Sequence, residues 1–359
     1  MRARLTWIVW ALAAATADAA LAQSQTFSLN EGREWVLETA PEPNSDEWII
    51  SEARRLIADG QLARAERNLS QWLDAPLHEA SPLRAEALIA RADAKTLQGR
   101  EYAALYDYEE VIRNNPGSPV FSRAIERELE IAIRYVNGLR RRFLGVFTID
   151  ATNVGIELLI RTQERLPGGQ LAERAAIELA DHYYQTREVE LAAEAYELYV
   201  LNFPEGPNVR KAARRRVYAD IARFKGPQYD ASHLIDAQVR IRRFARDYPA
   251  EAERTGLNQA LINRLDDSLG AQLLESAQWY LQINEDAAAR HVLRRLLRDY
   301  PHSSAARRAE GIMADRGWSN DLPAANPNNS EPDDPGVRTR GPVEAQPEGA
   351  PQTAEEPAP

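Results

Sequence analysis

Small and large apolar residues recur along this chain at intervals of about one helical turn. In the stretch "LAAEAYELYVLNFPEG", residues 191–206, Ala192 stands four residues before Tyr196, and Pro204 follows Tyr196 by eight residues. Residues four apart lie on the same face of an α-helix, and proline ends a helix because it lacks the amide hydrogen. The pattern therefore predicts a helix that packs closely through Ala192 and Tyr196 and stops at Pro204.

The same positions relative to a proline recur in other segments. They are Ala104 and Tyr108 before Pro116, Gly155 and Leu159 before Pro167, Ala237 and Ile241 before Pro249, and Ala289 before Pro301. A small side chain lets two helices approach each other, and the larger one a turn away fills the remaining space. Gly60 and Gly99 fall where a tight turn between paired helices is expected, because glycine accepts left-handed dihedrals.

A helical unit of about 34 residues with these marks resembles the tetratricopeptide repeat. The resemblance implies an all-α fold, a right-handed α-solenoid of about five to six helix pairs, with a groove lined by the first helix of each pair. The alternative is a non-repeating helical domain in which the spacing arises by chance. Uneven distances between the closing prolines predict two insertions, at residues 137–150 and 224–233.

The two ends of the chain differ in composition from the middle. Residues 1–22 carry Arg2 and Arg4 near the start, continue with a short apolar run and end in Ala20-Leu21-Ala22, as is typical of a secretory signal peptide. An uncleaved N-terminal anchor is the alternative. We expect an N-terminal extension at 23–45, the repeat domain at 46–315 and a disordered tail at 316–359. Within that tail, residues 319–359 hold nine prolines and eight acidic residues, a composition that suits a solvating or a partner-binding tail.

Several segments, in their order along the chain, are similar to the BamD family of periplasmic tetratricopeptide proteins, which act in outer-membrane β-barrel assembly. The segments are residues 45–74, 104–119, 192–206 and 290–310, the Phe143-Leu144-Gly145 insertion, and helices that end in an aromatic residue followed by proline, such as Phe203-Pro204. Members of that family are usually lipoproteins with a cysteine after the signal. This chain has no cysteine and carries Gln23 there, so we expect an exported, periplasmic protein without a lipid anchor.

Composition argues against several classes of function. The 359 residues carry a net charge of −10 and no cysteine, which disfavours nucleic-acid binding, thiolate metal sites and a cysteine nucleophile. The five histidines are scattered, and no nucleotide-binding or hydrolase motif is present. We therefore expect no cofactor, no metal ion and no catalytic site, and an enzyme built on the repeats is the weakest hypothesis.

Two sets of residues are candidates for binding other proteins. Counted from the packing positions, the groove should include polar side chains of the first helices, namely Arg54, Asp93, Asp181, Tyr184 and Gln278. In the first insertion, apolar residues follow three arginines, as in an exposed interaction loop, and we single out Arg141, Phe143 and Leu144. The alternative for such charged positions is a solvated helix face.

The resemblance implies a non-catalytic scaffold in outer-membrane β-barrel assembly. Its partners would be the periplasmic domains of the barrel-insertion protein or unfolded outer-membrane protein segments, with peripheral membrane association allowed. The alternative is a soluble periplasmic adaptor that coordinates cell-envelope or peptidoglycan machinery, and the missing cysteine favours it somewhat.

Overall fold

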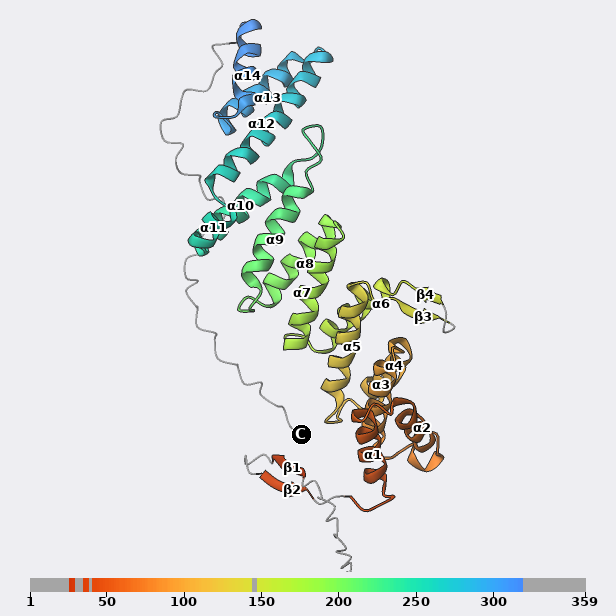
Figure 1. Cartoon of the computed structure of the whole chain (residues 1–359). Coiled ribbons are helices and arrows are strands. Elements are labelled where there is room, and N and C mark those ends of the chain that lie inside the picture. Colours follow the sequence, from red (N-terminus) through yellow and green to blue (C-terminus); the bar gives the residue numbers. More distant parts are fainter. Residues whose placement is uncertain (1–25, 30–34, 39–40, 144–146, 319–359) are drawn as a thin grey trace, which may run out of the picture. The chain divides into compact units, whose positions relative to one another are not determined.

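Fourteen α-helices make up most of the residues that the computed structural model describes, 26–29, 35–38, 41–143 and 147–318 (Figure 1). The chain divides into two compact units, Met1–Asp220 and Ile221–Pro359, and each is described by itself. The predicted all-α fold class, with tetratricopeptide-like helix pairs, is confirmed. The predicted signal peptide, residues 1–22, and residues 319–359 of the predicted tail lie outside the described residues.

The first unit consists of consecutive helices joined mostly by short turns. Their bounds are α1 Asp46–Ala58, α2 Leu62–Leu73, α3 Arg84–Leu97, α4 Glu101–Asn114, α5 Phe121–Val136, α6 Thr152–Arg165, α7 Gln170–Gln185, α8 Val189–Asn202 and α9 Val209–Ala222, with a single 3-10 turn at Pro76–His78. Gly60 and Gly99 have φ angles of 75° and 71° in the turns that close the first two pairs. Both glycines are therefore used as the sequence predicts, because other residues rarely adopt this region.

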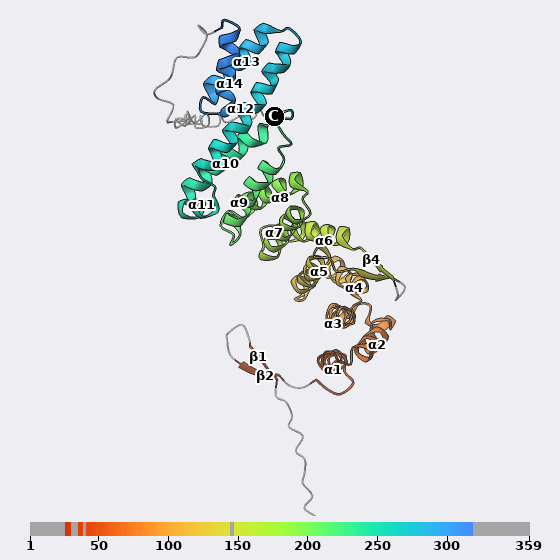
Figure 2. The ribbon, with the colours of Figure 1, turned by 45° about the horizontal axis from the view of Figure 1, so that its top comes forward.

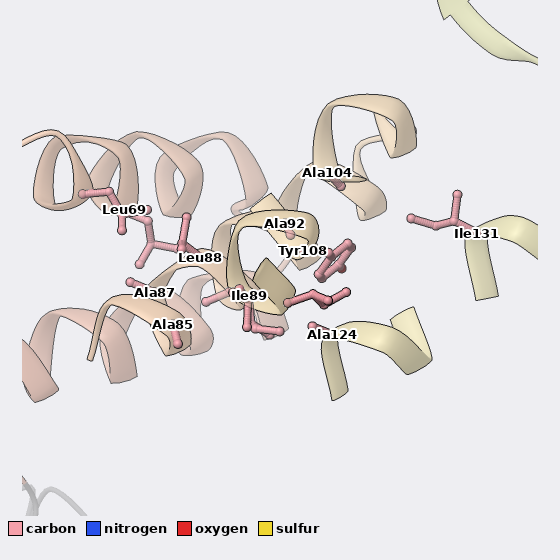
Figure 3. Close-up of a cluster of buried hydrophobic side chains, with 14 of the residues drawn as sticks. Leu69, Ala85, Ala87, Leu88, Ile89, Ala92, Ala104, Tyr108, Ala124 and Ile131 are labelled. Carbon is pink, nitrogen blue, oxygen red and sulfur yellow. The ribbon is translucent and has the colours of Figure 1, made fainter. Parts of the chain in front are cut away.

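The predicted small and large positions form the interior of the first unit. Ala104, Tyr108, Ala192 and Tyr196 are completely buried. Figure 3 shows Ala92 and Ala104 gathered around the Tyr108 ring, within a cluster that extends from α1 to α5. Further clusters join α5 to α7 and α7 to α9, so each helix pair shares its core with the next pair.

Gly155 lies where α6 approaches α5 so closely that a side chain would not fit. A Cβ atom added there would lie 2.8 Å from the Ala132 carbonyl oxygen and 2.9 Å from the Tyr135 Cβ. These atoms belong to α5, whereas Gly155 belongs to α6. The small residue that the repeat pattern places at this position is therefore required by the contact between the two helices.

The first insertion is a β-hairpin and not the irregular loop expected from the sequence. Strands β3 (Arg141–Phe143) and β4 (Phe147–Ile149) pair antiparallel, with Arg141 opposite Ile149 and Phe143 opposite Phe147. The hairpin projects away from the helices between the end of α5 and the start of α6 (Figures 1 and 2). Leu144 lies outside the described residues, and the side chain of Phe143 is not described.

A second hairpin lies in the predicted N-terminal extension. Strand β1 (Thr26–Leu29) pairs antiparallel with β2 (Trp35–Glu38), and Thr26 is opposite Glu38. The sequence reasoning assigned no element to residues 23–45. Each strand has only four residues, a length too short for a clear alternating pattern.

The second unit contains the remaining five helices. They are α10 Ser232–Asp247, α11 Pro249–Thr255, α12 Gln259–Gln282, α13 Asp286–Asp299 and α14 Ser304–Asp315. Pro249 was expected to close a helix, but it also begins α11, where a missing amide hydrogen costs nothing. The second insertion is shorter than predicted, because α10 begins at Ser232 and includes His233. Within the described residues, no helix is both long and apolar enough to cross a bilayer.

Candidate protein-interaction surface

A network of hydrogen bonds and ion pairs centred on Asp93 connects the three successive helices α3, α4 and α5. The Asp93 carboxylate on α3 accepts a hydrogen bond from the Tyr108 hydroxyl of α4 at 2.7 Å. It also contacts Arg123 and Arg127 of α5 at 3.0 and 3.3 Å. We call this group of four residues the first clamp. It places the predicted groove residue Asp93 in contact with the next two helices.

A second clamp repeats this arrangement around Asp181. The Asp181 carboxylate on α7 accepts a hydrogen bond from the Tyr196 hydroxyl of α8 at 2.7 Å and forms ion pairs with Lys211 and Arg215 of α9. In both clamps, the tyrosine and the two cations stand 15, 30 and 34 residues after the aspartate. This spacing is visible in the sequence, and it would have predicted the contacts.

The clamps keep their tyrosines protonated. Burial, together with the neighbouring Asp93 carboxylate, raises the pKa of Tyr108, and burial and the hydrogen bond to Asp181 raise the pKa of Tyr196. Tyr184 packs on the second clamp, with its ring edge-on to Tyr196 and Arg215 5.1 Å above its face. Asp181 and Tyr184 are therefore close together and both are engaged with other parts of the unit; their role in ligand binding stays a prediction.

The other predicted groove residues lie elsewhere. Arg54 on α1 forms an ion pair with Glu86 of α3 at 2.7 Å, and both side chains are partly exposed. Gln278 is half-buried on α12 of the second unit. The residue fifteen positions after it is Leu293 in place of a tyrosine, so the clamp is not repeated there. Four of the predicted groove residues therefore belong to the first unit and Gln278 to the second, and the role of the set in binding stays a prediction.

A buried charge cluster joins α4, α5 and α6. The Arg165 guanidinium donates to Glu128 and to Glu109, with both N–O distances 2.6 Å. Burial raises the pKa of Glu128 to about 7, and the nearby Glu109 carboxylate adds to the shift. Burial also acts on Glu109, but hydrogen bonds from Arg165 and Arg113 outweigh it and lower the pKa of that group.

An exposed aromatic and cationic surface lies where the hairpin meets α4. The guanidinium of Arg141 on β3 lies 4.4 Å above the ring of Tyr102, and that ring packs edge-on against Tyr106 at 5.7 Å. Tyr106 is 66% exposed and Phe147 is 65% exposed, while Ile149 pairs with Arg141 across the hairpin. We call these five residues the hairpin patch. It includes Arg141, one of the predicted site residues.

The hairpin patch has the composition of a protein-binding surface. Tyrosine, phenylalanine and arginine are enriched in protein interfaces, because aromatic rings give rigid contact area and the planar guanidinium offers several hydrogen-bond donors. The sequence reasoning missed Tyr102 and Tyr106. Their spacing of four residues on a helix was the signal that could have found them. Within the described part of the chain, no group of three or more histidine and acidic side chains could hold a metal ion.

Comparison with known proteins found a matching family and similar solved structures. Residues 151–327, just under half of the chain, match the family described as "YfiO: Outer membrane lipoprotein", so the BamD-like resemblance is confirmed over these residues. No match was found among curated proteins. Among solved structures, the chain is similar to the C-terminal part of a TPR repeat-containing protein from Cytophaga hutchinsonii. The identity is 13%, the TM-score is 0.37, and the match covers 75% of this chain and 88% of that one.

Proposed function

We propose that this chain, with its YfiO-like region at residues 151–327, is a non-catalytic scaffold in outer-membrane β-barrel assembly. The family match is the observation that carries the proposal. Tetratricopeptide-like helix pairs supply extended surfaces for other proteins, and the structure adds an exposed aromatic and cationic patch. The protein would work in the periplasm, in association with the outer membrane.

The hairpin patch is the proposed contact surface for the main partner. Its exposed rings and the Arg141 cation suit an interface with aromatic and acidic side chains. The partner would be a periplasmic domain of the barrel-insertion protein or a segment of an unfolded outer-membrane protein. The predicted groove residues Arg54, Asp93, Asp181, Tyr184 and Gln278 are proposed as a further, separate contact set.

Fractionation combined with crosslinking tests this proposal. The exported protein should be recovered with the outer membrane, and crosslinking in the envelope followed by mass spectrometry should identify the barrel-insertion protein. A Tyr106→Ala, Phe147→Ala variant should lose that crosslink and keep its helical circular dichroism, because both side chains are mostly exposed. Tyr229→Ala, which removes an exposed aromatic ring outside the patch, is the matched control.

A periplasmic adaptor for other envelope machinery is the second candidate. The absence of cysteine from this sequence, which contrasts with the lipoprotein description of the matched family, is the observation that favours it. Recovery of peptidoglycan enzymes alone, with the protein in the soluble periplasmic fraction, would support the adaptor and contradict the assembly scaffold.

A further inference from the structure

Helix α8 carries apolar side chains on two faces. Ala192, Tyr196 and Tyr199 are buried toward the rest of the first unit. On the outer face, Leu191 is 41% exposed and Leu198 is 57% exposed. Burial in the core explains why the residues of the first face are apolar. The second face has no such explanation within the described residues, because the part of a leucine side chain that stays exposed to water gains no free energy from burial.

The equivalent outer positions of other repeats are charged. Leu198 and Leu201 stand six and three residues before the closing Pro204. The residues six and three positions before Pro116 are Glu110 and Arg113, and those before Pro301 are Arg295 and Arg298. The fold therefore does not require leucine here. The apolar outer face is particular to α8 among these three helices.

Leu191 and Leu198 border a groove across α6, α7 and α8. The groove has a volume of about 400 Å³. Leu179 and Tyr183 of α7 contribute to its lining, together with Ile160 of α6 and Leu191 and Leu198 of α8. The three helices are consecutive neighbours within the first unit (Figure 1). An apolar hollow with partly exposed walls is a surface that a partner can cover.

Acidic side chains flank the apolar groove. Glu164 of α6 and Glu194 of α8 belong to its lining, and both are exposed. Neither carboxylate takes part in an ion pair with another residue of the described chain. Glu190 lies one turn before Glu194 on the same side of α8, so the two like charges repel each other. A partner that brings positive charge would relieve this repulsion.

The walls of the groove also determine which secondary structure a partner segment can have. They are side chains of three α-helices, whose backbone amide and carbonyl groups already pair within each helix. An added strand would find no free backbone edge here and would leave its own polar groups unpaired. A helix satisfies its own backbone. Leu191, Ala195 and Leu198 are spaced four and three residues apart, so they lie on one face of α8 and form an apolar wall against which such a helix can pack.

We infer that the groove lined by Ile160, Leu179, Tyr183, Leu191 and Leu198 is a docking site for a cationic amphipathic helix of another protein. The apolar face of that helix covers the leucines, and its lysine or arginine side chains lie against Glu164 and Glu194. The acidic rim opposes binding to an anionic membrane surface. This site is distinct from the hairpin patch and does not rest on the proposed function.

Model peptides test the docking site. A fluorescent leucine–lysine peptide with helical periodicity should bind the purified full-length protein, and a leucine–glutamate peptide with the same apolar face should bind at least about tenfold more weakly. Leu198→Asp and Glu194→Lys should each lower the affinity for the lysine peptide about tenfold or more. Both positions are exposed, so circular dichroism should not change.

Two matched variants separate specific docking from general attraction to an acidic protein. Leu97→Asp changes an exposed leucine on α3, and Glu126→Lys reverses an exposed charge on α5; neither lines the groove. Both should leave the affinity unchanged. If the control variants lose as much affinity for the lysine peptide as the groove variants, the proposal is overturned. So would a chain that sediments as a dimer and becomes monomeric in Leu198→Asp, because a second copy would then be the occupant.

Discussion

At the scale of single residues, aspartates on the first helices connect one helix pair to the next. The Asp181 side chain is only 14% exposed and receives hydrogen bonds from α8 and α9. A carboxylate in this position does more than line a surface, because its removal takes away the acceptor that the Tyr196 hydroxyl, Lys211 and Arg215 share. Sequence reasoning identified the residue and assigned it to a groove, but it did not identify its three contacts.

The second clamp gives a stability prediction. Asp181→Ala should lower the free energy of unfolding by about 1–3 kcal/mol, and Tyr196→Phe by about 1 kcal/mol, because charged hydrogen bonds are lost in a half-buried site. Urea unfolding followed by circular dichroism measures both. Glu190→Ala on the exposed side of α8 is the control. The double variant Asp181→Ala, Tyr196→Phe should lose less free energy of unfolding than the sum of the two single variants, since both substitutions remove the same hydrogen bond. Strictly additive losses would contradict the network.

The Glu128 carboxylate predicts a dependence of stability on pH. Its pKa is raised from 4.5 to about 7 in the folded state, chiefly by burial, so the folded protein binds this proton more tightly than the unfolded chain does. The stability from this group is therefore complete below the unfolded pKa and is lost as pH rises through about 7.

The Glu128→Gln variant isolates this effect. Glutamine cannot titrate, so the decrease in urea midpoint between about pH 5 and about pH 8 should be smaller in the variant than in the unmodified protein. Glu126→Gln, exposed on the same helix, is the control for the loss of one charge. An unchanged pH dependence in Glu128→Gln would show that Glu128 is not the group responsible.

At the scale of elements, the contact between α5 and α6 depends on Gly155. A methyl group there would meet a backbone carbonyl oxygen and two side chains at less than 3.0 Å. Gly155→Ala should therefore destabilise the protein by about 1–3 kcal/mol, although alanine favours helix. Gly311→Ala, in α14 with no atom near the added methyl, should stabilise it slightly. A neutral or stabilising Gly155→Ala would mean that the helices separate at little cost.

The helices could be predicted from the sequence, and the hairpins could not. The positions of Ala104, Tyr108, Ala192 and Tyr196 identified the paired helices because burial of one helical face repeats along many turns. Strands of three or four residues carry no such repetition. The hairpin patch also depends on the approach of Arg141 to Tyr102, a contact between residues far apart in the sequence, which no local pattern encodes.

At the scale of the molecule, the surfaces of the first unit have different chemistry. The hairpin patch combines aromatic rings with arginine, and the α6–α8 groove combines leucines with free carboxylates among the described residues. Two such surfaces suit a scaffold that holds two partners at once. The proposed assembly function assigns the main partner to the hairpin patch.

Site-specific photocrosslinking in the native envelope tests this claim most directly. A photoreactive phenylalanine would replace Tyr106, Phe147 or, as the control, the exposed Tyr229 in separate variants. We predict that positions 106 and 147 give an adduct with one and the same protein, the barrel-insertion protein, and that position 229 does not. Absence of adducts at both patch positions, or the same adduct at all three, would contradict the hairpin patch as the contact surface of the scaffold.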